Sequence, residues 1–328
     1  MRAVYFSEFD GDSIELRDVP EPREPEGREV LVRVQAAGLN RADLLQSRGA
    51  YPPPAGYSPN IPGMEFAGEI AEVGPDVSTW KVGDRVMAIT AGEAQAETVV
   101  IDDRLLMRTP GNLSFTEAAA IPEAFITAHD AVFSQAKLAA GETLLIHAVG
   151  SGVGIAGLQM AKARGITVVG TSRTADKLDR CRDFGLDKAI LTADGPVFAD
   201  KVKEATDGRG VNVILELVGG DYFPEDLNAL AIKGRIILVG LTAGRTSEID
   251  LGITLQKRVR IIGSVLRARP IGEKEAATRA FEKDFLGLFA TGEIKPMVDR
   301  TFPAEQAREA YKYLASNESF GKVVIEFS

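Results

Sequence analysis

The chain has 328 residues, of which 45% are hydrophobic and 26% charged, and its mean hydropathy is -0.01. These proportions are typical of a globular protein, and the length favours two domains of about 150 residues each. The formal net charge of -9 argues against a nucleic-acid or anionic-membrane partner, since both require a basic surface. The single cysteine, Cys181, excludes an internal disulfide and any zinc site built on two or four cysteines.

The N-terminal residues and the apolar runs bear on location. Residues 1–10 are typical of a strand that enters a turn, and they lack the apolar core and cleavage site of a signal peptide. No apolar run approaches the ~18 residues of a membrane span. Together with one free thiol, these features lead us to expect a cytoplasmic protein that does not interact with membranes.

The first third of the chain has the pattern of a small, irregular β unit. Hydrophobic and polar residues alternate over 29–36, 67–74 and 84–89, as expected for strands with one buried face. Residues 51–59 contain stacked prolines, which exclude a helix interior and a central strand. We therefore expect short strands separated by turns and loops in this region.

From about residue 112, helices and strands alternate. The pattern predicts helices over 153–164 and 176–184, together with short apolar strands over 143–148, 166–171, 211–217 and 234–240. Such alternation indicates βαβ units and a parallel, doubly wound sheet. After about residue 268 the sequence predicts a charged helix and a closing strand over 322–327.

A glycine-rich segment links the first of these strands to the helix that follows. Gly150, Gly152 and Gly154 offer a tight turn, close approach to a pyrophosphate and close packing of helix on strand, with the phosphates at the positive helix end. The spacing departs from G-x-G-x-x-G, because the residue three positions beyond Gly152 is Ile155. The alternative interpretation is a strand-to-helix turn that binds no nucleotide.

The end of the second strand indicates which dinucleotide binds. A site for NAD places Asp or Glu there to bind the ribose 2'-hydroxyl. This chain instead has Ser172 and Arg173, with Lys177 one helical turn later. Charge-assisted donors of this kind suit a 2'-phosphate, so we expect NADPH. The alternative is that both cations belong to a solvated face.

Several motifs together resemble the medium-chain dehydrogenase/reductase superfamily, and more narrowly its zinc-independent NADPH:quinone oxidoreductase (zeta-crystallin-like) branch. They are residues 40–43 (NRAD), 63–65 (GME), 82–86 (VGDRV), 119–124 (AAIPEA) and 147–154 (HAVGSGVG). The resemblance covers nearly the whole chain. It implies an α/β protein with a GroES-like β-barrel catalytic domain at 1–120, an NADPH-binding Rossmann domain at 121–267, and a return to the catalytic domain at 268–328.

The resemblance also implies functional residues. Tyr51 and Asn40 would be catalytic, and the remaining predicted positions would bind the cofactor: Thr127, Gly150, Gly152, Val153, Gly154, Ser172, Arg173, Lys177, Gly240, Leu241, Val265, Leu266 and Asn317. Many relatives carry a tyrosine against the adenosine 2'-phosphate where this chain has residues 190–192 (ILT), so that contact is lost. A homodimer through edge strands, here residues 259–264, is a further implication.

The resemblance bears on metal chemistry as well. Zinc alcohol dehydrogenases of the superfamily hold zinc with Cys and His where this chain has Asn40 and Met64, which are poor zinc ligands, so we expect no metal. We interpret both histidines, His129 and His147, as structural. Without a Lewis acid the substrate must be electron-poor, which a quinone and an α,β-unsaturated carbonyl both satisfy.

Tyr51 would then stabilise the oxyanion that forms as hydride arrives, although tyrosines in such loops also simply pack. Three functions stay open at this point. They are an NADPH-dependent quinone reductase, an enoyl or alkenal reductase, and a low-turnover NADPH-binding structural or RNA-binding protein of the zeta-crystallin type.

Overall fold

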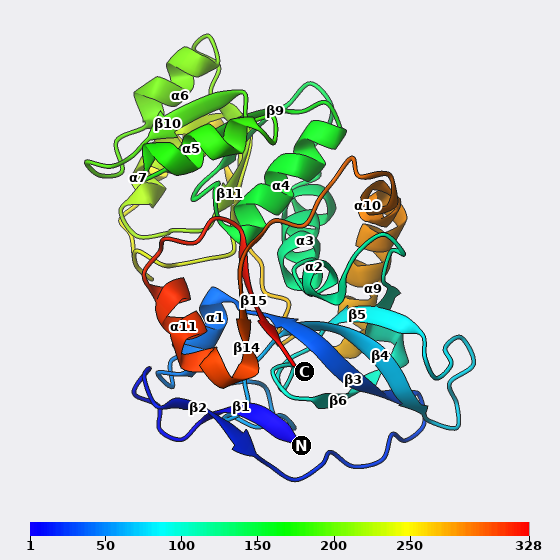
Figure 1. The fold of residues 1–328 in the computed structure, drawn as a ribbon. Coiled ribbons are helices and arrows are strands. Elements are labelled where there is room, and N and C mark those ends of the chain that lie inside the picture. Colours follow the sequence, from blue (N-terminus) through cyan, green and yellow to red (C-terminus); the bar gives the residue numbers. More distant parts are fainter. Residues whose placement is uncertain (328) are drawn as a thin grey trace. The chain divides into compact units, whose positions relative to one another are not determined.

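The structure is a computed structural model that describes residues 1–327, and the chain divides into two compact units. The first unit contains residues Met1–Ile126 together with the C-terminal segment from Leu266 onward, and the second contains Thr127–Val265. The polypeptide therefore leaves the first unit, builds the second and returns, which is the split organisation expected from the sequence (Figure 1).

The second unit is built on a six-stranded parallel sheet with strand order β10-β9-β8-β11-β12-β13. The strands are β8 (Thr143–Ile146), β9 (Thr167–Ser172), β10 (Lys188–Leu191), β11 (Val211–Glu216), β12 (Leu230–Leu238) and β13 (Arg260–Gly263). From β8 the chain adds β9 and β10 on one side of the sheet, and from β11 it adds β12 and β13 on the other side. The strand order therefore reverses between the neighbouring parallel strands β8 and β11. Ligands of such sheets bind at the carboxyl ends of the strands beside this reversal.

Helices cover both faces of this sheet (Figure 1). Ile214 packs in one hydrophobic cluster with residues of the helices at Ala199–Ala205 and Tyr222–Ala229, whereas Ile146 and Leu215 lie close to Gly157 of the helix at Gly152–Ala163 on the other face. Because both faces are covered, the strands are almost continuously apolar, as in β8 and β11. The helices are α4 (Gly152–Ala163), α5 (Ala175–Arg182), α6 (Ala199–Ala205), α7 (Tyr222–Ala229) and α8 (Leu251–Lys257).

The first unit contains a seven-stranded sheet in which β3 is the central strand. β3 pairs antiparallel with β4 along one side, and on its other side with β6 and then β15. Register shifts in the β3–β4 pair bend these long strands. The strands of this unit are β1 (Arg2–Phe6), β2 (Ile14–Asp18), β3 (Glu29–Gly38), β4 (Glu65–Val73), β5 (Arg85–Ile89), β6 (Thr98–Asp102), β7 (Leu106–Arg108), β14 (Val298–Pro303) and β15 (Lys322–Glu326).

The core of the first unit combines residues from both ends of the chain. Val32 and Phe66 from the N-terminal strands pack in one cluster with Tyr311 and Val323 from the C-terminal segment. The helices of this unit are α1 (Arg41–Gln46), α2 (Phe115–Ala118), α9 (Ile271–Phe281), α10 (Gly287–Thr291) and α11 (Ala307–Ala315), while α3 (Pro122–His129) spans the boundary between the units. The C-terminal segment is thus an integral part of the first unit.

The sequence-based boundaries differ slightly from those of the compact units. The expected changes at 120/121 and 267/268 lie six residues before and two residues after the changes at 126/127 and 265/266. Arg267 belongs to the first unit because its guanidinium binds carbonyl oxygens of Ala91 and Tyr51 there. Among the described residues, no helix has the length and apolar character needed to cross a membrane.

Candidate functional site

The glycine-rich segment forms the connection between β8 and α4, as the sequence predicted. Within this connection, Ala148 has a positive φ of 46°. This conformation is unusual for a residue other than glycine, and it turns the chain out of the sheet. Ser151 caps α4 by accepting a hydrogen bond from the Gly154 N–H at 3.1 Å. A β carbon on Gly154 would lie 2.7 Å from the carbonyl oxygens of Ala148 and Val149, so only glycine fits.

This geometry suits a diphosphate. The first-turn N–H groups of Gly152 and Val153 have no carbonyl partner within α4, because each would need one four residues earlier. They point from the positive end of a helix dipole, the arrangement that binds phosphate in dinucleotide folds. The residues present therefore fit the pyrophosphate of a nicotinamide dinucleotide.

The predicted adenosine end lies at the tip of the neighbouring strand. Ser172 is the last residue of β9 and is buried, and its hydroxyl accepts a hydrogen bond from the Thr174 N–H at 3.2 Å. Arg173 is exposed in this turn, and Lys177 is half-buried one turn into α5. Within residues 190–192, where the resemblance implies a tyrosine in many relatives, buried Thr192 accepts a hydrogen bond from Tyr222 at 3.0 Å.

The other predicted cofactor residues of this unit occupy the same edge of the sheet. Gly240 follows β12, and a β carbon there would lie 2.6 Å from the carbonyl oxygen of Leu217. Leu241 and Val265, which follow β12 and β13, are 47% and 49% exposed, and such apolar exposure suits a ligand-contacting surface. Thr127 is buried in α3.

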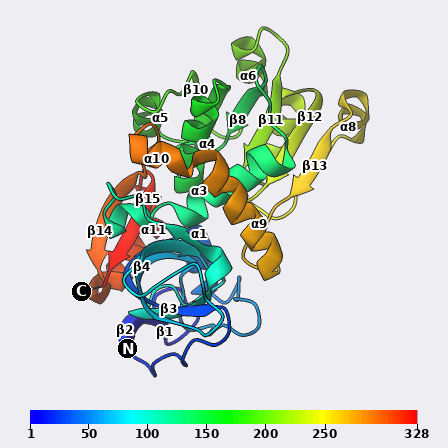
Figure 2. The same ribbon diagram turned by 90° about the vertical axis from the view of Figure 1, so that its right-hand side faces the viewer.

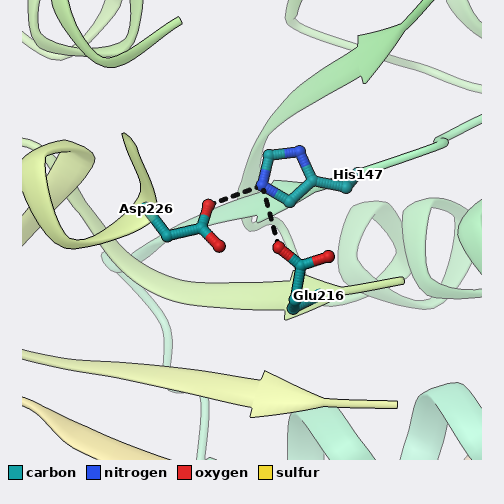
Figure 3. Close-up of side chains that lie close together, drawn as sticks. All are labelled: His147, Glu216 and Asp226. Atoms are coloured by element: carbon teal, nitrogen blue, oxygen red, sulfur yellow. Dashed lines mark hydrogen bonds and ion pairs between the residues drawn. The ribbon is translucent and has the colours of Figure 1, made fainter. Parts of the chain in front are cut away.

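A buried cluster of ionisable side chains consists of His147, which directly follows β8, Glu216 at the end of β11, and Asp226 in α7 (Figure 3). His147 Nε2 is 2.7 Å from an Asp226 oxygen and 3.8 Å from a Glu216 oxygen, and Nδ1 is 2.8 Å from the Thr171 hydroxyl. Glu216 Oε1, which is not the oxygen that faces His147, accepts hydrogen bonds from the N–H groups of Val218 and Gly219. We interpret His147 as structural, in agreement with the sequence.

Burial shifts the pKa of each member of this cluster. It raises the pKa of Glu216 to about 8 and that of Asp226 to about 7, and it lowers the pKa of His147. A low dielectric disfavours the charged form of every group, and the two carboxyl groups repel each other when both are ionised. The cluster therefore holds at least one carboxyl proton at neutral pH.

We expect the stability of the protein to fall as pH rises from about 4 to about 8 because of this cluster. In that window the folded state keeps carboxyl protons that the unfolded state has already released near the ordinary pKa values of 3.8 and 4.5, and the dependence ends above the folded pKa values of about 7 and 8. Each retained proton corresponds to about 1.4 kcal/mol per pH unit within that window. Glu216→Gln, whose amide mimics the protonated acid, should flatten this dependence, as measured by thermal unfolding followed by circular dichroism.

Asp200→Asn is the matched control, because the Asp200 side chain is 99% exposed in α6 of the same unit. It should keep the pH dependence of the wild type. If Glu216→Gln kept that dependence too, the buried carboxyl groups would not be its source.

In the first unit, Asn40 is part of a buried hydrogen-bonded network. Its carbonyl oxygen accepts from Lys322 Nζ at 2.6 Å, and its amide nitrogen donates to Glu65 at 2.9 Å. Lys322 also forms an ion pair with Glu65 at 2.5 Å and donates to the Leu39 carbonyl oxygen. The second contact of the amide nitrogen, with Gly38, is 3.5 Å long, so one amide hydrogen is only weakly bound.

Tyr51 begins the proline-rich loop and is half-buried. The guanidinium carbon of Arg267 lies 5.1 Å from the centre of its ring, and Arg267 Nη1 donates to its carbonyl oxygen at 3.0 Å. Burial raises the pKa of the Tyr51 phenol, whereas the positive charge of Arg267 acts in the opposite direction. The phenol is therefore protonated at neutral pH and can donate a hydrogen bond.

Glu123 is a third ionisable group of this region. Its backbone N–H donates to Glu65 at 2.8 Å, which fixes the start of α3 beside the Asn40 network. Burial, assisted by the charge of Glu65, raises the pKa of Glu123 to about 8. Buried Lys274 lies near enough for its charge to favour the ionised form, although burial lowers its own pKa. Glu123 is thus a second proton donor at neutral pH.

The remaining predicted residues of the first unit lie near these groups. Leu266 is buried and immediately precedes Arg267, and exposed Asn317 accepts a hydrogen bond from Arg41, the neighbour of Asn40. The structure therefore places Asn40, Tyr51, Leu266 and Asn317 in one unit and the other predicted residues in the second. The sequence prediction did not assign a role to Glu65, Arg267 or Lys322, whose side chains contact Asn40 or Tyr51, or to Glu123, whose N–H binds Glu65 at the start of α3. The charged residues in otherwise apolar segments at 65 and 322 were the available signal.

Comparisons with known proteins agree with this architecture. Residues 26–131 match the family model of the alcohol dehydrogenase GroES-like domain, and residues 152–283 match that of zinc-binding dehydrogenase. The chain therefore belongs to the medium-chain dehydrogenase/reductase superfamily, whose fold combines a GroES-like domain with a parallel-sheet Rossmann domain. Members of this class are oxidoreductases that use a nicotinamide cofactor.

Individual relatives narrow the family. The quinone oxidoreductase of Pseudomonas aeruginosa is 33% identical over 330 residues, which cover 99% of both chains. The crystal structure of a quinone oxidoreductase from Pseudomonas syringae pv. Tomato has a TM-score of 0.88, with 28% identity over 99% of both chains. The apo JamJ enoyl reductase has a TM-score of 0.87, with 27% identity over 100% of this chain and 99% of that one. The protein belongs to the quinone oxidoreductase (zeta-crystallin-like) branch.

The matching family description names zinc, and the donor atoms of this chain do not suit that metal. The Lys322 ammonium already contacts both Asn40 and Glu65, so a positive charge lies among these oxygen atoms. Met64, at the other expected ligand position, is a buried neutral thioether. The Lys322 ammonium lies 2.5–2.6 Å from oxygen atoms of Leu39, Asn40 and Glu65, and a divalent cation would have to displace it from all three.

Proposed function

We propose that the protein is a metal-independent quinone reductase that uses NADPH. Two features of the first unit carry the proposal. Tyr51 is a protonated phenol beside the buried Arg267 cation, and Asn40 belongs to a hydrogen-bonded network in which Lys322 supplies the positive charge. These groups supply hydrogen bonds and no Lewis acid. The similarity to quinone oxidoreductases supports the same assignment.

The reaction needs little from the protein beyond orientation and charge stabilisation. The residues of the glycine-rich segment would hold a nicotinamide dinucleotide, which would supply the hydride. Tyr51 then donates a hydrogen bond to the substrate oxygen that gains negative charge, with Asn40 as a further donor through its weakly bound amide hydrogen. Because a hydroquinone oxygen takes its proton from solvent, no general acid is required.

Enoyl or alkenal reduction is the second candidate, supported by the similarity to the JamJ enoyl reductase and by Glu123. Reduction of a carbon–carbon double bond requires a proton at carbon as well as hydride. Glu123, whose pKa is raised to about 8, and Tyr51 are two groups of the first unit that are protonated at neutral pH. The RNA-binding alternative is disfavoured by the net charge of -9.

We also propose that the protein forms a homodimer, in which β13 of one copy lies against β13 of a second copy of this chain. β13 is an edge strand that pairs only with β12 among the described strands, so its other edge is free to extend the sheet (Figure 2). Apolar side chains are exposed on and near this edge, including Leu251 (70%), Leu255 (77%) and Ile261 (40%).

Turnover of a substrate panel tests the proposed function. We expect NADPH oxidation, followed by its near-ultraviolet absorbance, to be fastest with benzoquinones or phenanthrenequinone and unaffected by chelators. Saturated aldehydes and ketones should not react, because no metal polarises them. Faster turnover of enones than of every quinone would instead support the enoyl reductase, and loss of activity on metal removal would contradict the metal-independent reaction.

A further inference from the structure

A single buried arginine connects the returning C-terminal segment to the Tyr51 loop. Arg267 is 4% exposed, and the segment around it returns from the second unit. Its Nε donates to the Ala91 carbonyl oxygen at 2.7 Å, and its Nη1 donates to that of Tyr51 at 3.0 Å. Its Nη2 donates to the Gln46 side chain at 2.5 Å. Each nitrogen of the guanidinium group therefore has an acceptor.

These contacts fix both ends of the loop. Tyr51 begins it, and Gln46, which Arg267 binds, donates from its amide to the Pro59 carbonyl oxygen at 2.9 Å. Residues 52–54 are prolines, which restrict the backbone between these points. A loop that Arg267 holds directly at one end and through Gln46 at the other has few conformations to lose when substrate binds.

The same guanidinium lies over the Tyr51 ring, at 5.1 Å from its centre. A cation at this distance is attracted to the aromatic face and restricts ring rotation. Its charge also stabilises the phenolate and so makes the neutral phenol a stronger hydrogen-bond donor. One side chain thus controls both the position and the acidity of the hydroxyl group.

We infer that Arg267 is the positioning residue of Tyr51, whose backbone and ring it holds in place for a hydrogen bond to the substrate oxygen. The inference rests on the proposed function, in which Tyr51 donates to that oxygen. Arg267 itself touches neither substrate nor reacting atoms in this role. A lysine cannot replace it, because an ammonium lacks the planar geometry needed for three separate acceptors and the ring.

Titration of Tyr51 in the free protein tests the inference without any cofactor. Phenolate absorbance of the wild type minus that of Tyr51→Phe reports the ionisation of this one residue. In Arg267→Met, measured against Arg267→Met/Tyr51→Phe, the pKa of Tyr51 should rise, because the nearby positive charge is gone. An unchanged pKa would overturn the inference.

Kinetics give an independent test. Arg267→Lys should lower kcat for a quinone by about 3- to 10-fold, no more than the loss of Tyr51 itself, with little change in KM for NADPH. In the Tyr51→Phe background the same change should cost less than about 2-fold, since residues that act through one another are not additive. Fully additive losses would contradict the inference.

Arg235→Lys controls for the loss of a buried arginine. Arg235 is 6% exposed in the second unit, forms an ion pair with Glu142 at 2.6 Å and binds the carbonyl oxygens of Ala136, Lys137 and Asn212. Among the described residues, no tyrosine ring lies against its guanidinium group. The Arg235→Lys substitution should lower thermal stability and leave the pKa of Tyr51 unchanged. If Arg267→Met does not fold, Arg267→Gln serves for the titration, because it also removes the positive charge and keeps hydrogen-bonding groups. If Tyr51→Phe is fully active, the proposed role of Tyr51 fails, while the titration still decides whether Arg267 controls that residue.

Discussion

Replacing Tyr51 with phenylalanine should lower quinone turnover by about 10-fold, the value of one imperfect hydrogen bond to a developing oxyanion. The phenol is half-buried, protonated and held by Arg267, so the substitution removes one donor and keeps the ring. If the protein were instead an enoyl reductase that used Tyr51 as its acid, enone turnover should fall by roughly 10²–10⁴-fold. NADPH oxidation with a quinone and an enone, for wild type and variant, separates the two functions.

Tyr57→Phe is the control for this experiment. Tyr57 belongs to the same proline-rich loop, where its side chain packs against Gly92. Loss of its hydroxyl group should leave both activities near those of the wild type. Enone turnover that greatly exceeds quinone turnover and collapses in Tyr51→Phe would contradict the quinone assignment. Enone turnover that survives Tyr51→Phe and falls in Glu123→Gln would identify Glu123 as the acid.

Local sequence patterns were sufficient to predict a large part of the second unit. A parallel sheet covered on both faces needs apolar strands too short for helices, and β8, β9 and β11 have that character, whereas β10 and the helices α6, α7 and α8 were not predicted. Ser151 begins α4 through a cap, and Gly154 is required by a contact within its own connection, so this site also depends on neighbours in sequence. The residue with positive φ there is Ala148, which no glycine pattern could have indicated.

The Tyr51 and Asn40 environments depend on contacts between distant parts of the chain. Arg267 and Tyr51 are separated by 216 residues, and Lys322 and Asn40 by 282 residues. A buried cation such as Lys322 is stable only because its acceptors are brought together by folding. Its sequence neighbours form a strand and give no indication of those acceptors. The sequence could therefore suggest Asn40 and Tyr51 through a resemblance, and could not reveal the charges that hold them.

The charges at the tip of β9 give the second large expected effect. Arg173→Ala and Lys177→Ala should each weaken NADPH binding by about 10- to 100-fold while NADH binding changes little, because a charge-assisted hydrogen bond contributes roughly 1.5–3 kcal/mol. Arg173 is exposed at the turn, and Lys177 lies one helical turn away in α5. Both cations are near solvent, so the preference for NADPH should decline as salt concentration rises.

The residues around Thr192 make these two cations especially important. Thr192 accepts a hydrogen bond from Tyr222, and the strand before it offers no aromatic side chain for an adenosine phosphate to pack against. Dissociation constants for NADPH, NADH and 2'-AMP, measured by titration calorimetry, provide the readout. Arg182→Ala removes the same charge from the end of α5, where Arg182 pairs with Asp179, and should spare all three ligands. Equal weakening of NADPH and NADH in Arg173→Ala and Lys177→Ala would mean that these side chains do not recognise the 2'-phosphate.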